Sequence, residues 1–405
     1  MDLRYGPEYE RFRQEVREFL AETWPLSGEE AKLERVQQSA RFRKRAIARG
    51  YLARAVPRAY GGSEQPPDVL RASIIREEFA RAGAPLDVGA PAAQLIPTLV
   101  AHGTEEQKRA YLPGTVTGEL LWCQGYSEPG AGSDLASVQT RAELVDGEWV
   151  IHGQKIWTSY AHWAEMIYML VRTEPAAAGK HAGLSYLLVD MQQPGIDVRP
   201  LKSLNGDSHF NEVFFDGARA PADRIVGRRG QGWNVSRSTL QAERNAVATA
   251  DTTLKQFSEL LELAKSTRRN GRPAIEDPAV RQRLVEIEGY VTSHEYSSHR
   301  QLTCAARGES PGLIGTMNKL VGTDIATRMA RLGLEISAEG ALDAPYHHAE
   351  MLTGGSGEAN PVARFLHSLS IRAGGGTSNI QRNIIGERGL GLPRDFAVQK
   401  RKAPA

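Results

Sequence analysis

Two short segments combine glycine-rich turns with hydroxyl, acidic and aromatic side chains. Residues 127–134 read Ser-Glu-Pro-Gly-Ala-Gly-Ser-Asp, and residues 153–159, after one strand-like stretch, read Gly-Gln-Lys-Ile-Trp-Thr-Ser. Glycine adopts conformations closed to other residues, so the first turn lets backbone N–H groups approach a phosphate or an acceptor-rich ring. Trp157 offers a flat apolar wall and Ser159 a donor. Each segment alone is typical of an ordinary turn or strand end, but the pair predicts a flavin site.

The composition is that of an ordinary globular protein. The 405 residues include 41% hydrophobic and 24% charged residues, which favours two or three domains. Fifty Lys and Arg against 48 Asp and Glu leave a net charge of +2, too small a field to attract nucleic acid or an anionic membrane. No apolar signal core opens the chain, and no apolar run reaches the ~20 residues that span a bilayer. We therefore expect a cytoplasmic protein with no nucleic-acid partner and no membrane span.

The cysteines suggest neither a disulfide framework nor a metal site. Cys123 and Cys304 are the only two, and they lie far apart without the spacing of metal ligands. We expect both to be buried free thiols.

Hydrophobic periodicity divides the chain into helical, β and helical parts. Apolar residues three and four apart predict a first helix, the pattern returns over 73–82, and Thr104 before two glutamates predicts a helix start. Short apolar stretches over 166–171, 184–189 and 212–215 predict strands, and helical periods then cover 240–264, 280–306 and 314–334, with the last helix ending near Gly389. The expected domains are 1–120 (helical), 121–233 (β) and 234–395 (helical bundle), followed by a tail over 396–405.

The chain resembles the acyl-CoA dehydrogenase family over nearly its full length. Besides the two segments above, the family's markers occur in order at 56–62 (Val-Pro-Arg-Ala-Tyr-Gly-Gly), 103–108, 220–227 and 376–382 (Gly-Thr-Ser-Asn-Ile-Gln-Arg). The resemblance implies an α+β fold with an N-terminal helical domain, a central β domain and a C-terminal four-helix bundle. It also implies FAD lying between the β domain and the bundle.

The resemblance assigns the cofactor-binding residues. Gln124, Tyr126 and Ser127 would line one edge of the flavin, and Trp157 and Ser159 the other. The remaining residues of the expected site are Gly132, Ser133, Thr158, Thr377 and Gln381, with Ser133 near the acyl-CoA phosphates or pantetheine. Family members usually carry Thr where Ser127 and Ser159 stand, and serine keeps the hydroxyl that bonds the ring.

The chemistry implied by the resemblance is dehydrogenation of an acyl-CoA thioester. A base removes the α-proton and the β-hydrogen passes to flavin N5 as hydride, which leaves a trans-2-enoyl-CoA. Many members carry the base as a Glu directly before the C-terminal Gly-Thr pair, where this chain has Gly375, whose N–H could still bond the thioester oxygen. A subset places the Glu before an Arg on the first long helix of the bundle. Glu243 and Arg244 match that placement, so we predict Glu243 as the base, with Arg244 orienting it or the CoA. The alternative is a solvated helix pair.

Two segments depart from the family pattern. Homomeric members bind the FAD diphosphate of the neighbouring subunit through segments that correspond here to 267–271 and 335–340. Asn270 replaces a Phe, and Glu335 and Glu339 would bring negative charge near a diphosphate, although Arg268 or Arg269 could take over the role of the missing Arg. The departures favour a heterotetramer with a homologous subunit, as in members that act on steroid-side-chain CoA thioesters. A homo-oligomer with a divergent diphosphate site is the alternative.

The electron acceptor and the alternative functions follow from the same resemblance and from the charge. The family implies electron-transferring flavoprotein as the electron acceptor. A flavin-dependent oxidase or monooxygenase of the same fold would act on a substrate without CoA. A nucleic-acid-associated relative would be expected to show a basic stripe, which the near-neutral charge argues against.

Overall fold

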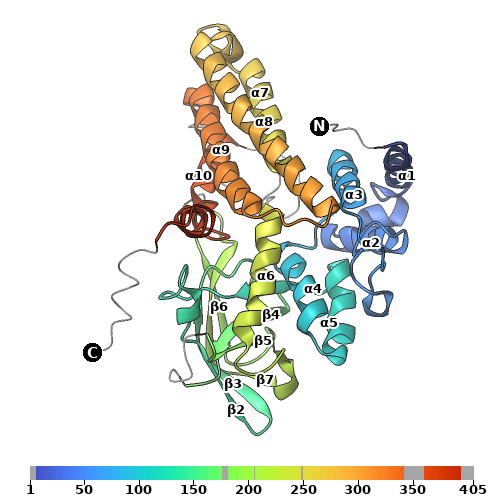
Figure 1. The fold of residues 1–405 in the computed structure, drawn as a ribbon, viewed down its shortest axis with the longest axis vertical. Coiled ribbons are helices and arrows are strands. Elements are labelled where there is room, and N and C mark those ends of the chain that lie inside the picture. The colour runs from blue at the N-terminus through green and yellow to red at the C-terminus, as the bar shows by residue number, and fades with distance from the viewer. Residues whose placement is uncertain (1–5, 176–180, 205, 248–249, 342–359, 394–405) are drawn as a thin grey trace. The chain divides into compact units, whose positions relative to one another are not determined.

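The computed structural model describes residues 6–175, 181–204, 206–247, 250–341 and 360–393, which form two compact units (Figure 1). The first unit runs to Glu243 and holds the N-terminal helices, the sheet and most of α6 (Gly232–Val247). The second unit begins at Arg244 and is helical apart from one short hairpin. The predicted order of helices, strands and helices is confirmed, whereas domain boundaries at 120 and 233 stay a prediction.

Five helices open the first unit: α1 (Pro7–Thr23), α2 (Arg35–Ala48), α3 (Val69–Ala82), α4 (Ala90–His102) and α5 (Glu105–Thr117). The first expected helix is confirmed, because Phe12, Val16 and Phe19 are buried on one face of α1. The start predicted at Thr104 is also confirmed. Its hydroxyl accepts from the N–H of Gln107 at 3.2 Å, and the Gln107 side chain accepts from the N–H of Thr104 at 3.1 Å. These two bonds satisfy donors that a helix start leaves open.

A buried carboxylate joins α1 to α3. Glu78 is 2% exposed, and Arg13 and Arg17 of α1 donate to it at 2.8 and 3.0 Å. Arg81 forms a further ion pair with it at 2.6 Å. Burial by itself would raise the pKa of Glu78, but the hydrogen bonds from Arg17 and Arg13 outweigh it, and the pKa lies below its ordinary value.

The Glu78→Gln variant is expected to lose about 3 kcal/mol of stability at pH 7, because the largely buried Arg13 and the more exposed Arg17 and Arg81 lose their buried counter-charge. Since the folded pKa of Glu78 is depressed, its contribution is present above the unfolded value and lost as pH falls through the folded one. Urea unfolding between pH 7 and pH 3 should therefore show a flatter acid dependence in the variant. Equal acid slopes for the two proteins would contradict this assignment.

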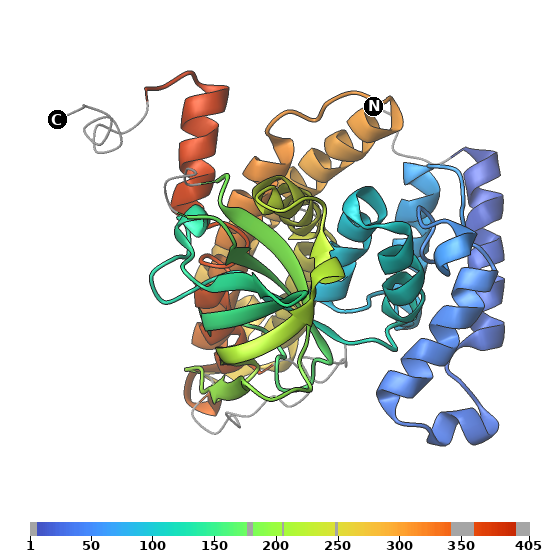
Figure 2. The ribbon, with the colours of Figure 1, turned by 90° about the horizontal axis from the view of Figure 1, so that it is seen from below.

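The first unit contains an eight-stranded sheet (Figure 2). Its strands are β1 (Trp122–Gly125), β2 (Arg141–Val145), β3 (Glu148–Lys155), β4 (Met166–Arg172), β5 (Leu184–Asp190), β6 (Ile196–Leu201), β7 (Phe210–Pro221) and β8 (Ile225–Val226). The order is β6-β7-β3-β2-β4-β5-β8, with β1 pairing parallel to β4. The three predicted strands correspond to β4, β5 and β7.

Both faces of the central strands are covered, which explains their unbroken apolar sequences. Tyr168 of β4 and Tyr186 of β5 belong to a core shared with the N-terminal helices. Met169 and Leu187, their neighbours along the strands, point into a second core on the opposite face. Cys123 also lies in this second core, where burial raises the pKa of its thiol. The other cysteine, Cys304, is only partly buried, so the expectation of two buried thiols was wrong for it.

The second unit is built on four packed helices: α7 (Asp251–Ser266), α8 (Pro278–Ala306), α9 (Ile314–Ser337) and α10 (Pro361–Ser370). They are followed by α11 (Ser378–Ile384) and a π-helical turn that ends at Gly389, where the last helix was expected to end. The single helical period predicted over 240–264 is two helices, α6 and α7. Asp251 places a carboxylate in the first turn of α7, which favours a helix start there. Among the described residues, no helix has the length and apolar content that a membrane crossing requires.

Candidate active site

The first predicted edge of the site follows β1. Gln124 is half-buried on this strand, and Tyr126 is buried against Tyr168 and Tyr186 with edge-to-face ring contacts at 6.0 and 6.3 Å. Burial raises the pKa of Tyr126 well above its usual value, so its phenol stays protonated. Ser127, next along the chain, is only half-buried. The end of β1 therefore places the amide of Gln124 and the hydroxyl of Ser127 next to the tightly packed ring of Tyr126.

A buried ion pair fixes the turn that follows. The Lys155 side chain is fully buried at the end of β3 and donates to Glu128 at 2.8 Å and to the carbonyls of Leu170 and Tyr126 at 2.7 and 3.2 Å. Glu128 also accepts from the backbone N–H groups of Gln139 and Thr140. Burial lowers the pKa of Lys155 to about 8, against the opposing effect of Glu128. Both charges are satisfied, as buried charges must be.

The glycine-rich turn next to this ion pair is open to solvent. Glu128 and Ala131 exchange two backbone hydrogen bonds at 2.9 and 3.0 Å, which closes the turn. Beyond it, Gly132 and Ser133 are exposed, and a Cβ added at Gly132 would meet no atom within 4 Å. A ligand could therefore approach this backbone closely, and the binding of one here stays a prediction.

The second predicted edge is a strained loop after β3. Trp157 has a φ of +60°, which is unfavourable for a residue with a bulky side chain, and is 59% exposed apart from an edge-to-face contact with Phe210. The loop is held by Asn211 of β7. The backbones of Asn211 and Thr158 form two hydrogen bonds with each other, both of 3.1 Å. The Asn211 side chain also donates to the Thr158 carbonyl at 2.9 Å.

The two edges are joined directly, because the N–H of Ile156 donates to the carbonyl of Ser127 at 2.9 Å. Ser127 and Trp157 therefore lie on one continuous surface. Within the part of the chain that the structure describes, the buried hydroxyl of Thr158 has no hydrogen-bond partner. This surface fits a flat, partly polar ring such as an isoalloxazine. It offers the exposed indole of Trp157, the half-buried Ser159 and the unpaired hydroxyl of Thr158.

A polar network leads from this surface to α6. Gln124 donates to the side chain of Gln94 on α4 at 3.2 Å, and the phenol of Tyr168 donates to the same oxygen. Tyr186, stacked on Tyr168, contacts the hydroxyl of Thr239 on α6 at 3.3 Å. The residues that sequence reasoning missed here, above all Gln94 and Asn211, come from elements far away in the chain.

The predicted catalytic pair lies on α6, but the side chains of Glu243 and Arg244 lie outside the described residues. The backbone places position 243 four residues after Thr239, which is one helical turn further on the same face. That face contacts Tyr186 and, at 2.9 Å, the hydroxyl of Thr98. Position 243 is thus near the end of a face that packs on the sheet.

The remaining predicted residues form a cluster of their own in the second unit. Thr377 caps α11, since its hydroxyl accepts from the N–H of Ile380 at 3.2 Å. Gln381 is buried and donates to the carbonyls of Gly375 and Gly376 at 3.4 and 3.2 Å. The turn before α11 is therefore held from the helix that follows it.

Comparison with known proteins decides the family. Models of the N-terminal, middle and C-terminal domains of acyl-CoA dehydrogenases match residues 6–119, 123–218 and 230–390. The acyl-CoA dehydrogenase IpdE1 of Mycolicibacterium smegmatis is 38% identical over 96% of this chain and 99% of its own. The chain belongs to the acyl-CoA dehydrogenase family. Its activity is that of an oxidoreductase, and members of this family use FAD.

Solved structures of this family resemble the chain over almost its full length. The structure described as "Tcur3481-Tcur3483 steroid ACAD" has a TM-score of 0.78 and 28% identity, over 98% of this chain and 100% of that one. The ChsE4-ChsE5 complex from Mycobacterium tuberculosis has a TM-score of 0.77 and 29% identity over the same shares. The fold expected of an acyl-CoA dehydrogenase is thereby confirmed.

The two segments that depart from the family pattern have local structural explanations. Residues 268–269 and 272–273 form a two-stranded hairpin, and Asn270 and Gly271 both have positive φ at its turn. Asparagine and glycine suit such a turn, which a Phe would not. Arg268 donates to the carbonyl of Gly271, Arg269 lies 3.5 Å from Asp277, and Glu335 forms an ion pair with Arg283. The charge of Glu335 is therefore balanced within the chain, while the side chain of Glu339 lies outside the described residues.

Proposed function

We propose that this chain carries the FAD site and the catalytic base of an acyl-CoA dehydrogenase, with Glu243 as the base. The observation that carries the proposal is the position of residue 243 on α6. It shares a helix face with Thr239, which contacts Tyr186. Tyr186 in turn packs against Tyr126, one of the residues that we assign to the flavin. A carboxyl group at position 243 belongs to the same part of the first unit as the proposed flavin surface.

FAD fits the surface formed by the two joined edges. The exposed ring of Trp157 would cover one side of the isoalloxazine, and the hydroxyls of Ser127, Thr158 and Ser159 would bond its polar edge. The open backbone at Gly132 and Ser133 would accept a phosphate or pantetheine group. When bound, FAD supplies the acceptor for the β-hydrogen of the thioester.

The protein's own residues must then handle the α-proton, which is only weakly acidic. Glu243 would remove it, with Arg244 orienting the carboxylate or the CoA. The developing negative charge on the thioester oxygen needs fixed donors, and we assign one of these to the N–H of Gly375. Because residue 375 is glycine, no carboxylate at that position competes with Glu243 for the α-proton.

We further propose a bulky, polycyclic acyl group as the substrate. One of the similar solved structures supports the idea by its description as a steroid acyl-CoA dehydrogenase. The turn at 374–376 is made only of glycines, and a Cβ added at Gly374 would meet no atom within 4 Å. A turn without side chains leaves space where a ring system could lie.

The proposed partner is a homologous second chain that supplies the diphosphate-binding residues, with electron-transferring flavoprotein as the electron acceptor. Both arginines that could replace the missing family residue are already engaged, Arg268 by Gly271 and Arg269 by Asp277. A similar solved structure, the ChsE4-ChsE5 complex, contains two named chains. The alternative is a homo-oligomer.

Anaerobic titration with acyl-CoA thioesters of graded bulk tests this function. The chain is produced alone and together with a candidate homologous chain, and native mass and FAD content are measured for both. We expect full FAD content only in the two-chain complex, and bleaching of flavin absorbance without oxygen that is fastest with a steroid-side-chain thioester. A homo-oligomer with one FAD per subunit would reject the partner, and a preference for short straight chains would reject the polycyclic substrate. Turnover that needs oxygen and no CoA would identify an oxidase or monooxygenase instead.

A further inference from the structure

The glycine turn of the second unit has a defined shape that glycine adopts without strain and other residues do not. Gly375 and Gly376 have φ values of +62° and +86°, and a Cβ at Gly376 would lie 2.6 Å from the side-chain nitrogen of Gln381. Both carbonyls accept hydrogen bonds from Gln381. Within the residues that the structure describes, the N–H of Gly375 donates no hydrogen bond. The turn therefore binds its carbonyls internally and leaves this N–H available.

A buried lysine spans the ends of the turn. Lys319 of α9 is 2% exposed, and its ammonium donates to the carbonyl of Gly376 at 2.7 Å and to that of Ile371 at 3.4 Å. A buried ammonium is costly unless hydrogen bonds replace its water. Because these carbonyls solvate the charge, the path of the chain from 371 to 376 depends on Lys319.

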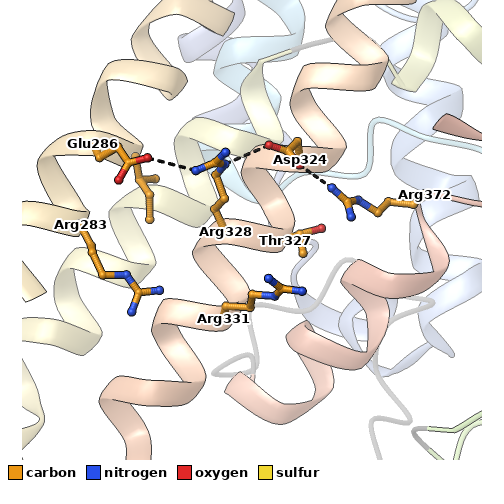
Figure 3. Close-up of a pocket in the computed structure, with 8 residues that line it drawn as sticks. Arg283, Glu286, Asp324, Thr327, Arg328, Arg331 and Arg372 are labelled. Atoms are coloured by element: carbon orange, nitrogen blue, oxygen red, sulfur yellow. Dashed lines mark hydrogen bonds and ion pairs between the residues drawn. The ribbon is translucent and has the colours of Figure 1, made fainter. Parts of the chain in front are cut away.

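Ion pairs hold the same segment from the outside of the bundle. Arg372 pairs with Asp324 of α9, which also pairs with Arg328 at 2.9 Å, and Arg328 reaches Glu286 of α8 at 3.1 Å (Figure 3). The Arg372 side chain points toward α9 from the segment that leads into the glycine turn (Figure 3). These exposed pairs contribute little individually. Among the charged contacts of this segment, the buried one from Lys319 is therefore expected to constrain the turn more than the exposed ion pairs do.

We propose that Lys319 is a positioning residue, which fixes the glycine turn so that the N–H of Gly375 can bond the thioester oxygen. This inference rests on the proposed function, which assigns that role to Gly375. Lys319 itself does not contact the reacting atoms in this scheme. It holds the carbonyls of Ile371 and Gly376, which lie on either side of the 374–375 peptide group along the chain, and this limits the orientations open to the peptide group that carries the donor. A misdirected donor would weaken enolate stabilisation, while FAD could still bind.

The test uses Lys319→Met and Lys319→Gln in the FAD-loaded protein, with Asn318→Leu as the matched control. Asn318 is also buried on α9, but its side chain contacts Ser297 and Gln301 of α8 and not the turn. The probe is an acyl-CoA analogue with an acidified α-carbon, whose bound anion gives a long-wavelength band against oxidised flavin. The apparent pKa of the bound analogue reports enolate stabilisation independently of turnover.

We expect Lys319→Met to raise that apparent pKa by about one to two units and to lower kcat about ten- to a hundredfold, which is part of the effect of losing an oxyanion donor. The change should fall on kcat more than on KM. Lys319→Gln, which can still donate to one carbonyl, should lie between Met and the wild type, and it carries the test if the Met variant fails to fold. Asn318→Leu should leave the analogue's pKa unchanged even if it lowers the melting temperature.

The outcomes separate this inference from the proposed function. If the wild-type protein does not lower the pKa of the bound analogue, the proposed function itself fails. If the wild type lowers it and both Lys319 variants lower it equally, the positioning role alone is overturned. An equal shift in Asn318→Leu would mean that general loosening of the bundle, and not Lys319, controls the donor.

Discussion

Glu243→Gln is expected to lower turnover by at least about a thousandfold while FAD content and substrate affinity stay close to normal. Glutamine keeps the shape and polarity of the side chain but cannot accept the α-proton at neutral pH. Loss of a general base typically costs 10²- to 10⁴-fold, and more where no other group can replace it. Position 375, where many family members carry the base, is glycine, so no side chain there can take over.

Rapid-mixing measurements of flavin reduction by the preferred acyl-CoA give the most direct readout, because they follow the chemical step without product release. Glu259→Gln is a suitable control with the same substitution, since Glu259 lies on α7 and pairs with Arg364 of α10. It should reduce flavin at nearly the wild-type rate. Near-normal reduction by a fully FAD-loaded Glu243→Gln protein would show that the base lies elsewhere, and would favour the solvated helix pair.

Local sequence patterns predicted most of the elements because the forces that form them are local. The hydroxyl of Thr104 and the following glutamates favour a helix start regardless of the rest of the fold, and the structure has one there. The apolar runs of β4 and β5 predict buried strands for the same reason. The break between α6 and α7 was missed because the hydrophobic period continues across it. The start signal at Asp251 is a single polar residue, so a periodicity argument gives it little weight.

The site could be predicted in part only. The segments around Ser127 and Trp157 are recognisable because each carries its glycines, hydroxyls and aromatic ring within a few residues. The contacts that support them are not, since Asn211 reaches Thr158 from 53 residues away and Gln94 reaches Gln124 from 30 residues away. Such pairs follow from strand order and helix packing, which no local pattern encodes. Glu128 and Lys155 occur within the predicted segments, but an isolated Glu and Lys suggest a solvated surface rather than a buried pair.

The buried pair leads to the second large effect. Lys155→Met is expected to cost about 3–5 kcal/mol of stability, because it leaves Glu128 as an uncompensated charge in the interior. Glu128 would retain the N–H groups of Gln139 and Thr140 but lose its only described cation. The turn after Ser127 would then lose its anchor to β3, so FAD retention should fall together with stability. At pH 7 the ammonium of the wild type is still charged, because its pKa is about 8.

Urea unfolding at pH 7 and the FAD content after gel filtration measure the two effects. The double variant Glu128→Gln with Lys155→Met removes both charges and should recover most of the stability, since replacing a whole buried pair is often neutral. Lys265→Met is the matched surface control, because Lys265 is exposed and pairs only with the exposed Glu262 among the described residues. It should change stability by less than about 1 kcal/mol. If Lys155→Met were as stable as this control and kept its FAD, the ion pair would not be what shapes the flavin surface, and the strained loop at Trp157 with its Asn211 contacts would have to hold that surface alone.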